Sequence, residues 1–301
     1  MLADAGSNGR QNAAGAGWAG GCLYVCATPI GNLDDITLRA ISVLSEASLV
    51  LAEDTRRTKI LAARYSIPGR IRSCHEHNEI ARLQEVIEAL QADRVVALVT
   101  DAGTPGLADP GADLIAGVAA AGYPVRPVPG ASAVLAALSV SGFAAGGFMF
   151  LGFLPRRRGE RAFVLERIQL EDQPVVLFES PKRMAATLKD LAAVMPERPA
   201  LLAREMTKRH EAYQWGTVAL LEEQFAPAAE RGEFTMVIGP PPSESEQRPH
   251  GRAAAGVPAE VLGRQVELLT DSGMPELEAI KCVARGHGVP KQVIYRLVRG
   301  G

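Results

Sequence analysis

Short apolar runs alternate with amphipathic segments along the first half of the chain. Five of these runs have the length of buried strands: residues 23–27, 48–52, 71–74, 95–99 and 124–128. Continuous apolar runs are typical of parallel strands that are covered on both faces. Helix-like segments separate the runs, so residues 21–147 are predicted to form an α/β domain with a mostly parallel sheet.

Each predicted strand is followed by a polar or glycine-rich segment: residues 28–32, 53–57, 75–79, 101–106 and 129–133. The carboxyl ends of parallel strands meet at one edge of a sheet, which is where open α/β sheets bind ligands. Five such segments at one edge therefore predict a binding site rather than a set of unrelated turns.

The segment after residues 95–99 is the most informative of the five. Asp101 is followed by small residues, through Gly106, that let a ligand approach the backbone closely. Asp109 is predicted to cap the next helix and Pro110 to occupy its first position, with Gly122 ending it. A tight structural turn is the alternative interpretation of the same residues.

The second half of the chain repeats the alternation of strands and helices after a hinge-like segment at 144–147. Residues 148–240 are predicted to form a second α/β domain, with helices at 160–170 and from 181 and strands at 148–153, 175–178, 200–203 and 234–238. Residues 241–257 are rich in Pro, Ser, Gly and Ala, which predicts a linker. Three short helical segments in residues 258–301 are typical of a helix-turn-helix-like module. Residues 1–20 are predicted to be a disordered leader.

Composition places the chain among ordinary globular proteins. Its 301 residues exceed a typical single domain, and 47% hydrophobic with 22% charged residues allow a sizeable core. No apolar stretch reaches about 18 residues without Gly, Pro or a charge, so a membrane span is not expected. Four cysteines do not make a disulfide framework in a chain of this length, which fits a reducing cytoplasm.

Although the net charge is only −2, the sequence contains two clusters of basic residues. Arg156, Arg157, Arg158 and Arg161 follow one predicted strand, and the segment from Lys281 to the end carries basic residues without an acidic one. Such clusters can neutralise the phosphates of a nucleic acid. A solvated surface is the alternative for either cluster.

Eight motifs stand in order along residues 23–239: TPIGNL at 28–33, AEDTR at 52–56, HEHNE at 75–79, DAGTP at 101–105, DPG at 109–111, PGASA at 129–133, GFLP at 152–155 and ESP at 179–181. Together they resemble the ribosomal RNA ribose methyltransferases of the tetrapyrrole-methylase superfamily, and the C-terminal segment is similar to the helical module of that family. The resemblance implies two α/β domains with a cofactor cleft between them.

The activity implied by the resemblance is transfer of a methyl group from S-adenosylmethionine to the ribose 2′-hydroxyl of a cytidine in the decoding region of 16S rRNA. It further implies a cytoplasmic homodimer, with 16S rRNA or the small ribosomal subunit as its partner and no membrane. The sulfonium of S-adenosylmethionine already activates the methyl group, so the reaction is expected to need no metal, only alignment of the reactants.

The resemblance also implies site residues. It places the cofactor against Pro29, Asp101, Ala102, Gly103, Ser132, Ala133 and Phe178. The residues predicted to contact the RNA through their positive charge are Arg56, Arg156, Arg157, Arg158, Lys182, Arg183 and Lys208. Ser132 and Ala133 would also suit tight helix packing. Lys182 stands where the family pattern has a histidine, which argues against proton transfer there but suits a phosphate.

A ribose hydroxyl is a weak acid, so a base should assist its loss of a proton. Asp54, His75 and Glu76 are the candidates, because they follow predicted strands at the same edge of the sheet. The alternative for Asp54 is a structural ion pair with Arg56 or a helix cap.

The run from Cys74 to His77 raises the question of a metal site. Alternation along a strand would put only two of its four side chains on each face, whereas a closed zinc site needs about four ligands. We therefore predict no metal, and we expect Cys22 and Cys26 in the core of the first strand.

Two other functions fit parts of the sequence. A corrinoid or sirohaem methylase of the same superfamily would carry a glycine-rich loop after the first strand, where this chain has TPIGN at 28–32. A nucleic-acid-binding protein without catalysis would use the C-terminal helices but would not need the full set of motifs at the sheet edge. Calorimetry with S-adenosylmethionine separates a methylase from such a binding protein. A nucleotide kinase is disfavoured because no glycine-rich loop ends in Gly-Lys-Ser/Thr.

Overall fold

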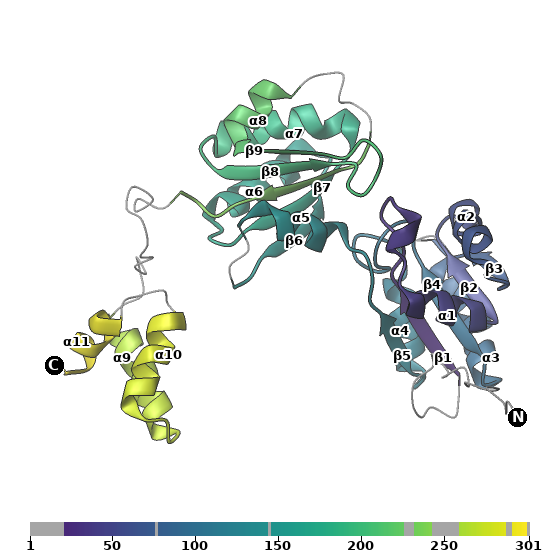
Figure 1. Ribbon diagram of the computed structural model, residues 1–301, viewed down its shortest axis with the longest axis horizontal. Helices are drawn as coiled ribbons and strands as arrows, with labels where there is room; N and C mark the ends of the chain where they lie inside the picture. The colour runs from purple at the N-terminus through teal and green to yellow at the C-terminus, as the bar shows by residue number, and fades with distance from the viewer. Residues whose placement is uncertain are drawn as a thin grey trace, which may run out of the picture. The chain divides into compact units, whose positions relative to one another are not determined.

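The computed structural model describes residues 21–75, 78–143, 146–225, 232–242, 259–286 and 291–299. It divides into two units, residues 1–241 and 242–301. Within the described residues, the first unit holds two five-stranded sheets and the second holds three helices (Figure 1). The predicted fold class is confirmed. The predicted leader, residues 144–145 of the predicted hinge, and residues 243–257 of the predicted linker lie outside the described residues.

The first sheet is parallel throughout, with the order β3-β2-β4-β1-β5. Its strands are β1 (Cys22–Cys26), β2 (Leu49–Ala52), β3 (Ile71–Ser73), β4 (Val95–Val99) and β5 (Val125–Val128). Its helical segments are η1 (Leu33–Asp35), α1 (Leu38–Glu46), α2 (Thr55–Tyr65), α3 (Glu79–Gln91) and α4 (Ala112–Ala120).

The three central strands β1, β2 and β4 are covered on both faces, which explains why they are almost wholly apolar, whereas the edge strands β3 and β5 each contain an arginine. In β4, Ala97 and Val99 pack with α1 and α2 on one face. The intervening Val96 and Leu98 pack with α3 and α4 on the other. The period of two along each strand thus divides one apolar run between two cores.

The start of α4 differs from the prediction. The helix begins at Ala112, with Gly111 at φ 122° as the preceding residue, so Asp109 is not its cap and Pro110 is not its first residue. The buried carboxylate of Glu79 instead accepts hydrogen bonds from the backbone N–H groups of Gly111 (2.8 Å), Asp113 (3.1 Å) and Leu114 (3.3 Å). A carboxylate from α3 therefore satisfies the free donors of this helix terminus, which leaves Asp109 available for another role.

Helix α5 (Ala133–Ser141) is capped by Ser132 at its start and by Gly142 at its end, where a φ of 79° favours glycine. It packs against the second sheet, since Val134, Ala137 and Leu138 share an apolar cluster with residues of β7, β8 and β10. The helix that follows the last strand of the first sheet thus covers one face of the second.

The second sheet is mixed, with the order β6-β7-β10-β8-β9. Its strands are β6 (Met149–Phe153), β7 (Val175–Glu179), β8 (Pro199–Arg204), β9 (Ala212–Thr217) and β10 (Phe234–Ile238). The first two are parallel and the other pairs are antiparallel. The predicted simple alternation of strands and helices is therefore wrong after β8, which pairs directly with β9.

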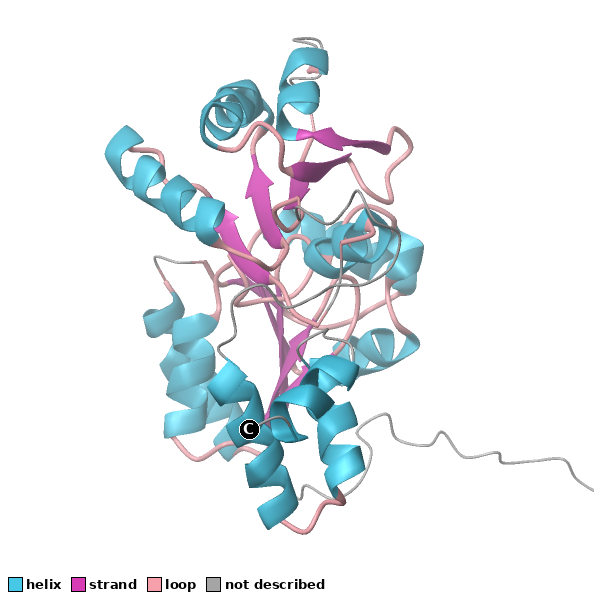
Figure 2. Ribbon diagram, turned by 90° about the vertical axis from the view of Figure 1, so that its left-hand side faces the viewer, coloured by secondary structure: helices cyan, strands magenta, loops and turns pink. Residues whose placement is uncertain are grey.

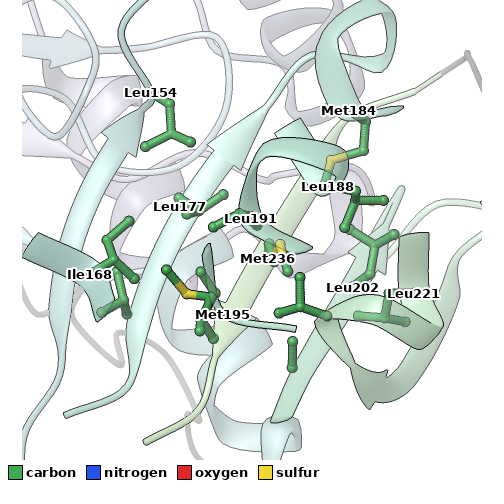
Figure 3. Close-up of a cluster of buried hydrophobic side chains, with 14 of the residues drawn as sticks. Leu154, Ile168, Leu177, Met184, Leu188, Leu191, Met195, Leu202, Leu221 and Met236 are labelled. Carbon is green, nitrogen blue, oxygen red and sulfur yellow. The ribbon is translucent and has the colours of Figure 1, made fainter. Parts of the chain in front are cut away.

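The other face of the second sheet carries α6 (Arg158–Leu170), α7 (Pro181–Val194) and α8 (Val218–Gln224). Leucine and methionine side chains from these helices and the strands fill the space between them, and Leu177, Met184, Leu188 and Met236 are almost fully buried (Figure 3). Figure 2 shows the helices flanking the strands of this unit.

The C-terminal unit consists of α9 (Ala259–Asp271), α10 (Glu276–Gly286) and α11 (Lys291–Arg299) (Figure 1). These helices pack on one another around Val266, Ile280 and Ile294. The three predicted short helices are present. No helix within the described ranges has the length and hydropathy needed to cross a bilayer.

Candidate active site

Two adjoining cavities lie in the first unit, next to the loops that follow β1 and β4. The smaller, about 200 Å³, is lined by residues that include Pro29, Gly31, Arg57, Thr100, Asp101 and Lys208. The larger, about 270 Å³, is lined by residues that include Asp109, Ala133, Phe153, Phe178, Glu179 and Met206. Both cavities share Ile30, Ala102 and Glu233, so these three residues mark the boundary between them.

A short backbone bridge holds the two loops together. Thr28 N–H donates to the carbonyl of Gly103 at 2.8 Å, and Gly103 N–H donates to the carbonyl of Thr28 at 3.1 Å. The Thr28 hydroxyl adds a bond to the carbonyl of Thr100 at 3.0 Å. Gly103 adopts a φ of 89°, which glycine accommodates readily. The structure therefore brings the predicted cofactor segments around Pro29 and Ala102 side by side.

Hydrogen bonds between carboxylates and their neighbours order the floor of the smaller cavity. Thr100 Oγ1 donates to Glu53 Oε2 at 2.8 Å. Asp54 N–H donates to Asp101 Oδ1 at 2.9 Å, and Arg57 Nε lies 3.4 Å from Asp101 Oδ2. Burial, together with the charge of Glu53, raises the pKa of Asp101. Asp101 thus anchors the loop after β2 to the loop after β4.

The contacts of Asp54 match the structural interpretation of this residue, an ion pair with Arg56 and a helix cap. It caps α2 by accepting the Arg56 N–H at 2.8 Å, and it pairs with the Arg56 guanidinium at 2.6 Å. These hydrogen bonds lower the pKa of Asp54 to about 2, which makes it a weak proton acceptor. Neither residue is among those that line the two cavities.

Of the other two predicted bases, the structure describes only His75. His75 donates its backbone N–H to Asn78 Oδ1 at 2.8 Å, and its ring lies 3.1 Å from the Asn78 amide nitrogen. It is not among the lining residues of either cavity. Glu76 lies outside the described residues.

Asp109, which was predicted from the sequence to cap a helix, instead lines the larger cavity. Its pKa is raised to about 6, first by burial and then by the charges of Glu53, Asp101 and Glu233, against a hydrogen bond with Thr100. The preceding residue, Ala108, has a φ of 62°, a strained backbone for a residue with a side chain. A perturbed carboxyl in a cavity beside strained backbone is typical of a functional site.

Phe178 forms part of an aromatic wall of the larger cavity. Its ring makes edge contacts with Phe150 at 5.1 Å and Phe153 at 5.8 Å between centroids. Beside it, the buried Glu179 accepts from Thr187 Oγ1 at 2.8 Å and pairs with Arg183 at 3.3 Å.

The predicted RNA-binding residues fall into two groups. Arg183 is engaged by Glu179 and by the carbonyl of Leu154 at 2.7 Å, and Lys208 pairs with Glu205 at 2.8 Å and Glu233 at 3.0 Å. The exposed group contains Arg56, Arg156, Arg157, Arg158 and Lys182. Within this group Arg56 pairs with Asp54 at 2.6 Å and Arg157 with Glu160 at 3.1 Å, and such exposed pairs exchange readily for a phosphate.

Ser132 and Ala133, both predicted as cofactor contacts, lie in different surroundings. Ser132 caps α5, and its hydroxyl accepts from Leu135 N–H at 3.4 Å, so the structural interpretation accounts for its visible contact. Ala133 lines the larger cavity, next to Phe178.

The loop between β8 and β9 closes over Gly31. Glu205 and Thr207 adopt φ values of 50° and 65°, and a Cβ built on Gly31 would lie 2.6 Å from Thr207 Oγ1 and 2.8 Å from the carbonyl of Met206. The β1 loop and the β8–β9 loop thus touch through a residue that has to be glycine.

Gly31→Ala is therefore expected to destabilise the protein by about 1–3 kcal/mol, because the neighbouring backbone has to shift. Urea unfolding measures the change. Gly159→Ala is the matched control, since a Cβ at Gly159 meets no atom within 4 Å. Equal stability of the two variants would show that the contact at Gly31 relaxes freely.

No group of three or more His, Cys, Asp or Glu side chains that could hold a metal is found among the residues that the structure describes. Cys22, Cys26 and Cys74 are buried, and burial raises the pKa of Cys26 to about 12 and that of Cys74 to about 11. At neutral pH these thiols are protonated and behave as apolar core groups.

Comparison with known proteins places this site in a family. Residues 22–222 match the model of the tetrapyrrole (corrin/porphyrin) methylases. The fold resembles uroporphyrin III C-methyl transferase from Thermus thermophilus (TM-score 0.52, 21% identity, 73% of this chain and 97% of the other). It also resembles the methyltransferase CobJ (TM-score 0.56, 20% identity, 73% and 94%).

Curated relatives are much closer in sequence. A Neisseria meningitidis protein named ribosomal RNA small subunit methyltransferase I is 44% identical over 92% of this chain and 93% of its own length. Proteins of the same name are 39% identical in Synechocystis (92% and 97%) and 41% identical in Thermotoga maritima (72% and 98%). The chain is therefore a methyltransferase of the tetrapyrrole methylase family and belongs to its ribosomal RNA small subunit methyltransferase I group, which confirms the resemblance seen in the motifs.

Proposed function

We propose that this methyltransferase transfers the methyl group of S-adenosylmethionine to the ribose 2′-hydroxyl of a cytidine in 16S rRNA. The observation that carries the proposal is the pair of adjoining cavities, which suits two reactants held next to each other. Relatives named for methylation of small-subunit rRNA, at up to 44% identity over most of the chain, support the substrate.

The residues of the larger cavity fit S-adenosylmethionine. Ala102 and Ala133 leave space near the backbone, and Phe153 and Phe178 offer aromatic surface for the adenosyl group. The carboxylate of Glu233 complements a sulfonium cation. When bound, the cofactor supplies a methyl group that is already activated. We propose Ala102, Ala133 and Phe178 as cofactor contacts, with Pro29, Asp101 and Gly103 ordering the adjacent loops.

The smaller cavity and the exposed arginines suit the RNA. Arg57 and Lys208 face this cavity, and the side chain of Arg157, at 86% exposure, holds only a surface pair with Glu160 at 3.1 Å. Exposed pairs of this kind are weak and exchange readily for a phosphate. We propose that Arg156, Arg157, Arg158 and Lys182 position the RNA backbone, and that the protein works as a homodimer in the cytoplasm.

The test is ribose-methylation mapping of 16S rRNA from cells with and without the protein, followed by methyl transfer with the purified protein and small subunits. A single cytidine should lose its 2′-O-methyl group without the protein and regain it in vitro. The in vitro reaction should proceed at an unchanged rate with a metal chelator present. Unchanged rRNA, with methylation of a corrinoid or porphyrin instead, would overturn the proposal.

A further inference from the structure

A ribose hydroxyl needs a proton acceptor, and four carboxylates line the two cavities: Asp101, Asp109, Glu179 and Glu233. We propose that Asp109 takes the proton from the 2′-hydroxyl as the methyl group is transferred. The inference rests on the proposed function, since it assumes a ribose hydroxyl as the nucleophile.

The other three carboxylates are committed to internal partners. Both oxygens of Asp101 are engaged, by Asp54 N–H at 2.9 Å and by Arg57 at 3.4 Å. The side chain of Glu179 is fully buried and pairs with Arg183. Glu233 accepts a charge-assisted hydrogen bond from Lys208 at 3.0 Å. Each of these three carboxylates therefore has to give up a partner before it can accept a proton from the substrate.

Asp109 differs from these three in its surroundings. Among the described residues no ion pair of Asp109 is found. It lines the larger cavity, and its hydrogen-bond partner Thr100 lines the smaller one. Asp109 therefore lies where the two cavities meet, which is where the acceptor oxygen and the methyl group have to come together.

The backbone around Asp109 is held in an unusual conformation. Ala108 precedes it at a φ of 62°, and Gly111 follows at 122° with its N–H bound by Glu79 at 2.8 Å. A non-glycine residue in this region costs about 1–3 kcal/mol and persists only where the surrounding structure imposes it. The fold thus holds the carboxylate in one place before substrate arrives.

The ionisation of Asp109 suits the role. Burial and the facing carboxylates Glu53, Asp101 and Glu233 raise its pKa to about 6, while the hydrogen bond with Thr100 opposes them. Arg57 and Lys208 are the cations that line the adjoining smaller cavity. At neutral pH the group is mostly ionised, yet it is more basic than an ordinary aspartate, which brings it closer to the working pH of a general base.

The proposed step needs no reactant other than the RNA and S-adenosylmethionine. A bond forms between the ribose oxygen and the methyl carbon, and the O–H proton passes to a carboxylate oxygen of Asp109. The bond between that carbon and sulfur breaks with its electron pair left on sulfur, so the sulfonium charge is lost. Asp109 then releases its proton to solvent.

Asp109→Asn tests the proposal, because it keeps the shape and removes the base. We expect kcat for RNA methylation to fall about 100-fold or more, while the Kd for S-adenosylmethionine, measured by calorimetry, changes less than threefold. Asp109→Glu should recover part of the rate. Asp54→Asn is the control and should keep kcat within about threefold.

Two readouts do not depend on activity. In the ligand-free protein, ¹³C NMR of labelled aspartate should show a carboxyl that titrates near pH 6 and is missing in Asp109→Asn. The pKa of Asp109 in the folded protein lies above its value in the unfolded chain. Ionisation of Asp109 therefore lowers the free energy of unfolding as the pH rises from about 4 to about 6. Asp109→Asn should therefore melt at least as high as the wild type at pH 7.

Wild-type kcat should fall as the pH drops through about 6, with the acid limb absent from the residual rate of Asp109→Asn. A wild-type rate in Asp109→Asn would overturn the proposal. So would a selective loss of cofactor affinity with kcat intact, which would make Asp109 a cofactor ligand. If wild-type protein methylates no RNA while Asp109 still titrates near pH 6, the proposed function fails rather than the placement of Asp109.

Discussion

Replacing Ala102 by leucine is expected to weaken cofactor binding about 100-fold or more and to abolish methyl transfer. Ala102 lines both cavities, so three added carbon atoms would enter the space where they meet. A fold-change of 100 corresponds to about 2.7 kcal/mol of binding free energy, which a side chain that occupies the ligand volume readily exceeds. Calorimetry with S-adenosylmethionine and a methyl-transfer assay measure the two effects.

The control for this substitution is Ala119→Leu, which adds the same atoms on an exposed face of α4. It should bind the cofactor and transfer methyl groups like the wild type. Circular dichroism and melting temperature should match for both variants. Cofactor binding by a folded Ala102→Leu protein at wild-type affinity would show that the cofactor does not lie at the boundary of the two cavities.

The first sheet could be predicted from the sequence because its strands are buried on both faces. Residues 95–99 read as a continuous apolar run, and β4 covers the same residues. Strand β9 was not predicted, because it is an edge strand whose residues are all half or fully exposed, with Trp215 53% exposed. A strand of this kind carries no apolar run, and only its pairing with β8 reveals it.

The edge of the sheet was predictable, but the choice among its carboxylates was not. Parallel strands place the segments after β1 and β4 together, and the structure joins them through Thr28 and Gly103. Which of these carboxylates is free to act depends on its partners in the fold. Glu79 takes over the helix terminus that Asp109 was predicted to cap, a contact between separate helices that spacing along the chain does not reveal. The ion pair of Asp54 with its neighbour Arg56 was one of two interpretations of the sequence, and the structure shows that it forms.

The C-terminal unit supports a second prediction about RNA. A groove of about 370 Å³ between α10 and α11 is lined by three cations, one aromatic ring and two aliphatic side chains: Lys281, Lys291, Arg296, Tyr295, Leu277 and Ile280. The cations suit phosphates, and the ring of Tyr295 suits a base. Lys281 pairs with Glu278 at 2.7 Å, an exposed contact that competes weakly with a phosphate.

Replacing Lys281, Lys291 and Arg296 by glutamine in the full chain is expected to weaken RNA binding about tenfold or more and to reduce the slope of log K against log salt by about two. Cofactor affinity should not change, because the larger cavity, where we place the cofactor, contains none of these residues. Fluorescence anisotropy with a labelled 16S rRNA fragment at several salt concentrations measures both quantities.

Arg264→Gln is the control, since it removes an exposed cation of α9 that is not part of the groove. It should leave affinity and salt slope near the wild-type values. We expect the groove to raise affinity for RNA while the chemistry stays at the two cavities of the first unit, so kcat at saturating RNA should survive the triple substitution. An unchanged salt slope would show that the groove does not hold phosphates, and a lost kcat would show that it acts in more than binding.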